Sequence, residues 1–295
     1  MARLYAVQAR FTPRRFTDPR RYAEWIEALA AQADSIAGLG PDSLLVYPED
    51  IGALLALLGA PEEAQSLEDA LRRLAARHAP RLALWALTLL LPPLKAYLRA
   101  RWREIWRTYS AAFSAVARRY KAYVVAGTIL EPRGRRVYNV AYLFDPQGRV
   151  AGRQAKVHLV DLEAELGVSP APHSWLRVHD TGAGRIGIAV CLDAFKEDVV
   201  SRLAAMGAQI LVQPSANPEP WTPSLEEEWR RGAWLAAQRH RFRAAVNPMA
   251  VGRVYDLEFE GVSSIVAPRD ATPGGTGYLA RAKSKDREEI VYAEA

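Results

Sequence analysis

The chain has 295 residues, of which 50% are hydrophobic and 24% charged, a composition that favours a globular protein over a disordered or membrane-embedded one. Its net charge of +6 is spread along the chain. This favours a solvated surface over a nucleic-acid-binding patch and leaves contact with anionic substrates or an anionic membrane surface open. Because Cys191 is the only cysteine, no internal disulfide can form, and we expect a reducing compartment, the cytoplasm. The first residues carry arginines and do not resemble a signal peptide.

The first third of the chain places an acidic residue after a strand. Leu4–Ala9 alternates apolar and polar residues and predicts an edge or early strand. Pro19–Ala37 has apolar residues at helical spacing and begins at an Asp-Pro pair, a favourable helix start. Leu44–Tyr47 predicts a short buried strand that ends at Pro48, so that Glu49 would lie at its carboxyl end. The helical patterns that follow are Ile51–Leu58 and Ala64–His78.

An apolar segment interrupts this pattern. Arg81–Leu94 is too short and too rich in proline to cross a membrane, which needs about 20 apolar residues. Lys95–Tyr120 follows as a long helical pattern rich in Arg, Trp and Tyr. We treat residues 80–107 as an apolar helical insertion in a single domain, 1–295, because no repeat or linker marks a boundary. The insertion could be a buried or subunit-facing helix pair, a lid over an apolar substrate, or a surface that lies on a membrane.

A lysine and a second glutamate follow a predicted β-hairpin. Tyr123–Leu130 and Val137–Phe144 predict two strands joined by a turn. Arg149–Gly152 then leads from a further turn towards Lys156, which apolar residues flank, and Glu163 lies seven residues later. We therefore expect Lys156 to follow a β unit, as the first glutamate does.

The only cysteine lies near the carboxyl end of a predicted buried strand, Arg185–Ala194, with Asp193 two residues beyond Cys191. In open α/β sheets, ligands bind outside this end of the strands. The remaining predicted elements are a helix at Lys196–Met206, a strand at Gln209–Val212, a proline-rich loop at Gln213–Trp221, a helix at Leu225–Arg243, and short strands at Ala244–Val246, Gly261–Val266, Gly277–Ala280 and Glu289–Tyr292.

The sequence contains no motif for a metal or a cofactor. There is no zinc-ligand spacing, no G-x-G-x-x-G after a strand and no P-loop, so we expect no metal and no cofactor. The five histidines form no ligand pair in the sequence, and we interpret His158 as structural.

Glu49, Lys156 and Cys191 follow strands in three separate β units and together carry a coherent chemistry. A thiolate is a nucleophile, and a neighbouring ammonium lowers the pKa of a thiol. A carboxylate can take the proton of the thiol and later a proton from water. The ammonium and the backbone N–H of Leu192 can stabilise negative charge on a carbonyl oxygen or a nitrile nitrogen. These residues suggest acyl transfer through a thioester without a metal; the alternative is an inert buried cysteine.

Four motifs stand in order along the chain: P-E-D at Pro48–Asp50, Y-N-V-A-Y-L-F-D-P-Q-G at Tyr138–Gly148, K-V-H-L at Lys156–Leu159 and C-L-D at Cys191–Asp193. Their order and spacing resemble the nitrilase superfamily of carbon–nitrogen hydrolases, over nearly the whole chain apart from the insertion. The resemblance implies an α/β fold, an α-β-β-α sandwich of two facing mixed sheets with helices outside. It also implies pairing into a homodimer or a larger assembly.

The resemblance also implies roles for four side chains. Glu49 matches the general base of the family, Lys156 its lysine and Cys191 its nucleophile. Glu163 matches the second glutamate of many members, which orients the lysine and assists catalysis.

We therefore expect hydrolysis of a non-peptide carbon–nitrogen bond, with a small-molecule amide as the first choice and nitriles or carbamoyl compounds as alternatives. Leu192, Asn217 and Trp221 are the candidate substrate contacts. Two other functions remain open. One is acyl transfer to an amine at a membrane surface, which the apolar segment Arg81–Leu94 motivates. The other is a non-catalytic scaffold on the same fold.

Overall fold

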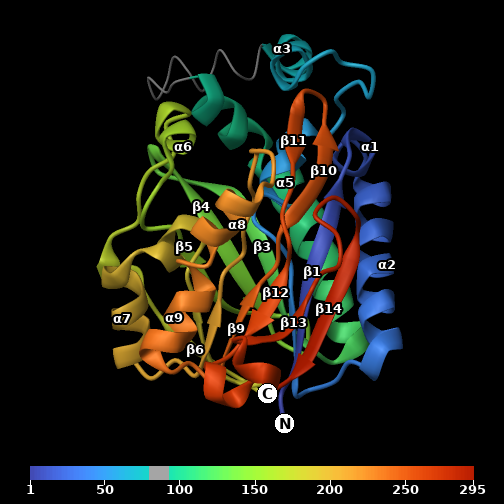
Figure 1. The fold of residues 1–295 in the computed structure, drawn as a ribbon. Helices are drawn as coiled ribbons and strands as arrows, with labels where there is room; N and C mark the ends of the chain where they lie inside the picture. The colour runs from blue at the N-terminus through green and yellow to red at the C-terminus, as the bar shows by residue number, and fades with distance from the viewer. Residues whose placement is uncertain (80–92) are drawn as a thin grey trace.

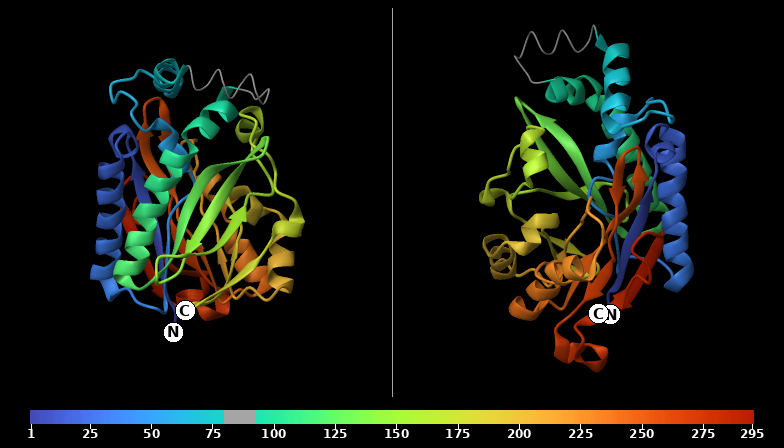
Figure 2. Two further views of the ribbon diagram at one scale, coloured as in Figure 1. Left: turned by 180° about the vertical axis from the view of Figure 1, so that it is seen from behind. Right: turned by 45° about the horizontal axis from the view of Figure 1, so that its top comes forward.

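The computed structural model describes residues 1–79 and 93–295, and its two β-sheets face each other with helices on both outer sides (Figures 1 and 2). One apolar layer lies between the sheets. Val46 and Val125 enter it from the first sheet, and Ile188 and Val212 enter it from the second. The expected α-β-β-α sandwich is confirmed.

Both sheets are mixed. The strands of the first are β1 (Arg3–Phe11), β2 (Ser43–Val46), β3 (Tyr123–Arg133), β4 (Arg136–Phe144), β5 (Val150–Ala155), β10 (Ala250–Val254), β11 (Leu257–Phe259) and β14 (Glu289–Glu294). Their order is β11-β10-β1-β2-β3-β4-β5, and β14 also pairs with β1. The strands of the second are β6 (Val178–Thr181), β7 (Gly184–Ile188), β8 (Ile210–Val212), β9 (Ala244–Asn247), β12 (Ser264–Val266) and β13 (Tyr278–Arg281), in the order β13-β12-β9-β8-β7-β6.

β1 lies in the middle of the first sheet. It pairs in parallel with β2 and β10 and antiparallel with β14, so the alternative of an edge strand is wrong. Leu4 and Ala6 face the layer between the sheets, whereas Tyr5 and Val7 face the helices. A strand that is buried on both faces is almost continuously apolar, and the sequence alone does not distinguish it from an edge strand.

The α-helices of the described residues lie around the two sheets. They are α1 (Pro13–Phe16), α2 (Pro19–Ala37), α3 (Leu67–Arg77), α5 (Pro93–Tyr120), α6 (Asp161–Glu165), α7 (Glu197–Ala205), α8 (Pro223–Trp229) and α9 (Ala233–His240). α2 and α5 contact each other and lie on the first sheet, and α7 and α9 lie on the second (Figure 1). The structure confirms the helix expected over Pro19–Ala37, where the Asp18 carboxylate accepts hydrogen bonds from the backbone amides of Arg20 and Arg21.

The helix expected over Leu225–Arg243 is two helices, α8 and α9. At the break, the N–H of Ala233 donates to the side chain of Gln213 at 2.8 Å instead of continuing the helical pattern. Gly232 lies at the break, and a Cβ there would come within 2.9 Å of the same Gln213 oxygen. A buried side chain from another part of the chain therefore ends the helix.

Three further elements differ from the expected ones. Ile51–Leu58 forms only a short 3₁₀ helix, Ala53–Leu57. The strand expected over Arg185–Ala194 ends at Ile188, and Cys191 begins a second 3₁₀ helix. β10 and β11 were not expected, because their short pairing depends on contact with β1, which lies far away in the sequence.

The apolar insertion is only partly described. The helical pattern over Lys95–Tyr120 is confirmed by α5, whereas most of Arg81–Leu94 lies outside the described residues. The role of the insertion at residues 80–107 and the assignment of residues 1–295 to a single domain stay predictions. Within the two described ranges, no helix combines the length and the apolar character needed to cross a bilayer.

Candidate active site

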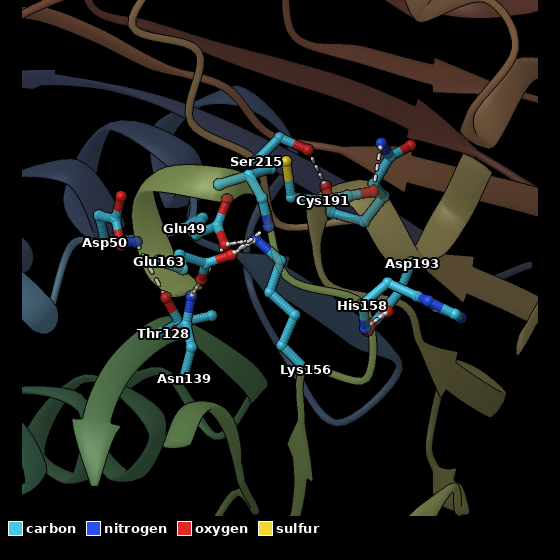
Figure 3. Close-up of polar contacts among 12 residues, drawn as sticks. Glu49, Asp50, Thr128, Asn139, Lys156, His158, Glu163, Cys191, Asp193 and Ser215 are labelled. Carbon is cyan, nitrogen blue, oxygen red and sulfur yellow. Dashed lines mark hydrogen bonds and ion pairs between the residues drawn. The ribbon is translucent and has the colours of Figure 1, made fainter. Parts of the chain in front are cut away.

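Glu49, Lys156, Glu163 and Cys191 line one cleft of about 520 Å³, although they are far apart in the sequence (Figure 3). Glu49 follows β2 and Lys156 follows β5, both in the first sheet, whereas Cys191 follows β7 in the second. Glu163 lies on α6. The expected convergence of an acid, an ammonium and a thiol is therefore present.

Lys156 lies between two carboxylates. Its Nζ is 2.8 Å from Glu49 Oε1 and 2.8 Å from Glu163 Oε2. The side-chain amide of Asn139, on β4, donates to Glu49 Oε1 at 2.9 Å and to Glu163 Oε1 at 2.8 Å. Lys156 and Glu49 are 1% and 3% exposed, so these charges have little water around them and rely on one another. The network fixes the ammonium and both carboxylates in position.

A glycine in β3 makes room for the Glu49 turn. The register between β3 and β4 shifts between Val125 and Thr128, and Gly127 within this bulge has φ +61°. A Cβ on Gly127 would lie 2.0 Å from the carbonyl oxygen of Pro48. The backbone N–H of Asp50 donates to Thr128 Oγ1 at 2.9 Å. Close packing on β3 therefore holds the residues on both sides of Glu49.

Cys191 lies in a strained turn between β7 and its 3₁₀ helix. Its φ is +47°, in the left-handed region that residues with a side chain rarely adopt. The turn is held from both sides, because the Cys191 N–H donates to the Pro214 carbonyl at 2.9 Å and the Cys191 carbonyl accepts from Gln213 Nε2 at 3.2 Å. None of the hydrogen bonds within the described ranges uses the N–H of Leu192, so this donor is available to a ligand beside the thiol.

Asp193 connects the lysine loop to the cysteine turn. Its buried carboxylate accepts hydrogen bonds from the backbone N–H groups of Val157 at 3.0 Å and His158 at 2.7 Å. Burial raises the pKa of Asp193 to about 6, although these two hydrogen bonds and the charge of Lys156 act in the opposite direction. Lys156 is thereby positioned by a residue that lies two places from the cysteine.

Burial acts on the pKa values of the thiol, the carboxylate and the ammonium of the site. Burial and the charge of Glu49 raise the pKa of the Cys191 thiol well above its usual value, although Lys156 acts in the opposite direction. The ammonium therefore acts on the thiol pKa in the expected direction, but desolvation and the charge of Glu49 outweigh it. Burial also raises the pKa of Glu49, with the charge of Glu163 adding to it. Burial alone would lower the pKa of Lys156, but the surrounding negative charges hold it well above its usual value.

The three candidate substrate contacts differ in their placement. Leu192 and Asn217 line the cleft. The Asn217 side chain is occupied by the backbone, since its amide donates to the carbonyls of Glu219 at 2.7 Å and Glu260 at 3.1 Å. Trp221 does not line the cleft and instead lines a separate, smaller cavity, 5.8 Å from the ring of Trp229.

Two histidines come together beside the cleft, which the sequence did not predict. Nε2 of His158 lies 2.9 Å and Nε2 of His173 lies 2.6 Å from the same Asp198 oxygen. Their ligand atoms are within 4.8 Å of one another, and within the described ranges this is the one group of three that could hold a metal ion. The expectation that the histidines form no ligand pair is therefore wrong for the folded chain, where His158 and His173 lie close together. None of the three residues lines the cleft.

Sequence reasoning missed two buried side chains that shape the site. Asn139 lies in the Y-N-V motif, whose polar residue within an apolar strand could have marked it. Gln213 joins the cysteine turn to the first turn of α9, and it stands at the end of β8 with no local pattern to distinguish it from a loop residue.

Curated relatives match parts of the chain. An omega-amidase of Saccharomyces cerevisiae is 30% identical over 189 residues, which are 61% of this chain and 61% of the relative. A nitrilase of Pyrococcus abyssi is 30% identical over 154 residues, which are 52% of this chain and 54% of the relative. A hydrolase of Schizosaccharomyces pombe is 30% identical over 111 residues, 36% of this chain and 34% of the relative. The chain thus matches between a third and three fifths of the length of these relatives.

Solved structures share the fold over the full length. An amidase of Nesterenkonia sp. AN1 superimposes with a TM-score of 0.65 at 18% identity, covering 100% of this chain and 93% of that one. A branch 10 member of the nitrilase superfamily from Saccharomyces cerevisiae gives a TM-score of 0.64 at 21% identity, covering 99% and 89%. The family model described as carbon-nitrogen hydrolase matches residues 60–294. The chain belongs to the carbon-nitrogen hydrolase family.

Proposed function

We propose that this protein hydrolyses the carbon–nitrogen bond of a small-molecule amide through a thioester on Cys191. The observation that carries the proposal is the buried Lys156 ammonium, held between Glu49 and Glu163 in the cleft that also contains the thiol. A neutral thiol beside a carboxylate of raised pKa can transfer its proton within the site.

In the first half-reaction, Glu49 takes the thiol proton while Cys191 Sγ forms a bond to the carbonyl carbon. The negative charge that develops on the carbonyl oxygen is stabilised by the Leu192 N–H and the Lys156 ammonium. The carbon–nitrogen bond then breaks, and the leaving nitrogen takes the proton from Glu49 and departs as ammonia or an amine. The acyl group remains on sulfur as a thioester.

In the second half-reaction, water attacks the thioester. Glu49 takes a proton from water, the new carbon–oxygen bond forms, and the carbon–sulfur bond breaks with return of the proton to sulfur. One amide and one water become one carboxylic acid and one ammonia or amine. Glu163 acts as a positioning residue, because it holds the Lys156 ammonium at 2.8 Å.

Relatives support this choice of reaction. Those matched above include an omega-amidase and a nitrilase. A mutant of the Nesterenkonia amidase carries the acetamide moiety of fluoroacetamide covalently on its active-site cysteine. A nitrile is the second candidate substrate, because the same thiol can attack a nitrile carbon and the nitrilase relative favours it.

The test is a screen of aliphatic amides and nitriles with ammonia release as the readout. We expect turnover by the wild type, loss of at least about 10³-fold in Cys191→Ala, and a thioester mass on the intact wild-type protein after rapid acid quenching. Circular dichroism would establish that the variant is folded. Full turnover by a folded Cys191→Ala protein would refute the proposed mechanism.

The proposal includes a homodimer in the cytoplasm. The family resemblance supports the pairing, and the single cysteine supports a reducing compartment. Sedimentation equilibrium measures the oligomeric state, and a mass of 32.7 kDa at all concentrations would exclude the homodimer.

A further inference from the structure

The walls of the Cys191 cleft are largely apolar. The side chains that form them come from α6, the cysteine turn, α8 and β11; they are Leu162, Phe195, Leu225, Trp229, Leu257 and Phe259. Leu162 is 53% exposed, so an apolar side chain faces water at this cleft. Burying an aliphatic group against such walls stabilises a complex by about 0.8 kcal/mol for each CH₂.

Acidic side chains outnumber basic ones among the described residues that line the cleft. Besides Glu49 and Glu163, four further acidic residues line it: Asp161, Glu219 and Glu228, and also Asp50, whose pKa burial raises well above its usual value. The one cation among the lining residues described is Lys156, which two carboxylates already neutralise. Within the described ranges, no ion pair with lysine or arginine is found for the four further carboxylates. A chain with a net charge of +6 therefore has an acidic cleft.

We infer that the substrate is an amide that carries an extended apolar group and no carboxylate. An anionic substrate would approach several unpaired carboxylates, and the described lining residues include no free cation to bind it. Juxtaposed like charges strongly oppose binding. Recognition of a carboxylate would need an arginine or lysine placed for it, and the described wall offers none. This inference rests on the proposed amide hydrolysis and names its substrate class.

A matched series of amides tests it. Heptanamide, 6-aminohexanamide and the monoamide of adipic acid have chains of similar length and differ in the neutral, cationic or anionic group at the far end. We expect kcat/KM for heptanamide and for 6-aminohexanamide to exceed that for the adipic monoamide by at least about 10-fold at low ionic strength. Acetamide should also be poorer than heptanamide. Equal or better turnover of the adipic monoamide would overturn the inference.

A second measurement separates this inference from the proposed reaction. Because Cys191 is the only cysteine, its alkylation by neutral iodoacetamide and anionic iodoacetate can be followed without interference. The iodoacetamide-to-iodoacetate rate ratio, divided by the ratio for 2-mercaptoethanol, should exceed about 10. A normalised ratio of one or below would overturn the inference. If no amide is hydrolysed, the proposed function fails. The normalised alkylation ratio then still measures whether the cleft disfavours anions.

Two double variants test which carboxylates cause the preference of the cleft for neutral over anionic reagents. Glu219→Gln with Glu228→Gln should lower the normalised alkylation ratio by at least about 3-fold, because two negative charges leave the cleft. The matched control is Glu24→Gln with Glu63→Gln, which removes the same charge from exposed residues that do not line the cleft. An equal change in both double variants would attribute the ratio to overall charge and refute the assignment to the cleft.

Discussion

Glu163→Gln tests the electrostatic role of the second glutamate. The two 2.8 Å contacts to Lys156 Nζ keep the interacting oxygens of Glu163 and Glu49 within about 5.6 Å of each other. At an effective dielectric constant of about 20, like charges at that distance repel by about 3 kcal/mol, or about two pH units. Because the charge of Glu163 raises the pKa of Glu49, its removal lowers that pKa. Glu49 then remains an ionised base at lower pH.

The assay is the pH dependence of kcat/KM, whose acidic limb reports the base of the free enzyme. We expect this limb to move down by one to two pH units in Glu163→Gln. At pH 7, kcat/KM should fall by about 10- to 100-fold, because Lys156 is held by one carboxylate instead of two. Glu165→Gln, an exposed change on the same helix, is the control and should leave the profile in place. An acidic limb that stays fixed or moves upward would refute the reasoning.

Three further changes test the supporting structure. Gly127→Ala should lower the free energy of unfolding by about 3 kcal/mol or more, because the added Cβ would strike the Pro48 carbonyl. The control is Gly134→Ala, at a residue with φ +56° and open space around it, which should lower the free energy of unfolding by only about 1–2 kcal/mol. Gln213→Leu should cost about 2–4 kcal/mol in urea unfolding, because two buried backbone groups lose their partner; an unchanged midpoint would contradict this. The pKa of Asp193, about 6 against an ordinary 3.8, means that only the folded state holds this proton between those pH values. The stability of the wild type relative to Asp193→Asn should therefore fall by about 2 kcal/mol as pH rises from 4 to 6, and parallel stability curves would contradict the assignment.

The convergence of the site was predictable because strand ends carry positional information. Glu49 comes directly after a short apolar strand that ends at a proline, and Lys156 follows a hairpin. Parallel strands that pack in the same sandwich bring their carboxyl ends to one region, so reactive residues at these positions meet. The helix that begins at Pro19 was predictable for a related reason, since its capping residue and its apolar positions lie within one local segment.

The features that were not predicted depend on partners from distant parts of the chain. The break before Ala233 is made by Gln213, and the pairing of β10 is made by β1. His158 and His173, which are 15 residues apart, meet at Asp198 on α7. The raised thiol pKa depends on burial, which a sequence does not report, whereas the opposing charge of Lys156 could be anticipated. Local pattern therefore identified the reacting groups but not their environment.

The division of the site between two sheets links packing to chemistry. Glu49 and Lys156 belong to the first sheet and Cys191 to the second, so the layer between the sheets sets the spacing between base and sulfur. Two neighbouring residues of β3 pack in different layers: Val125 faces this inter-sheet layer, and Val124 faces the helices. Both valines are fully buried, and loss of methyl groups from either one leaves a cavity. Only the cavity beneath Val125 lies in the layer that spaces the two catalytic halves, so packing there bears on turnover as well as on stability.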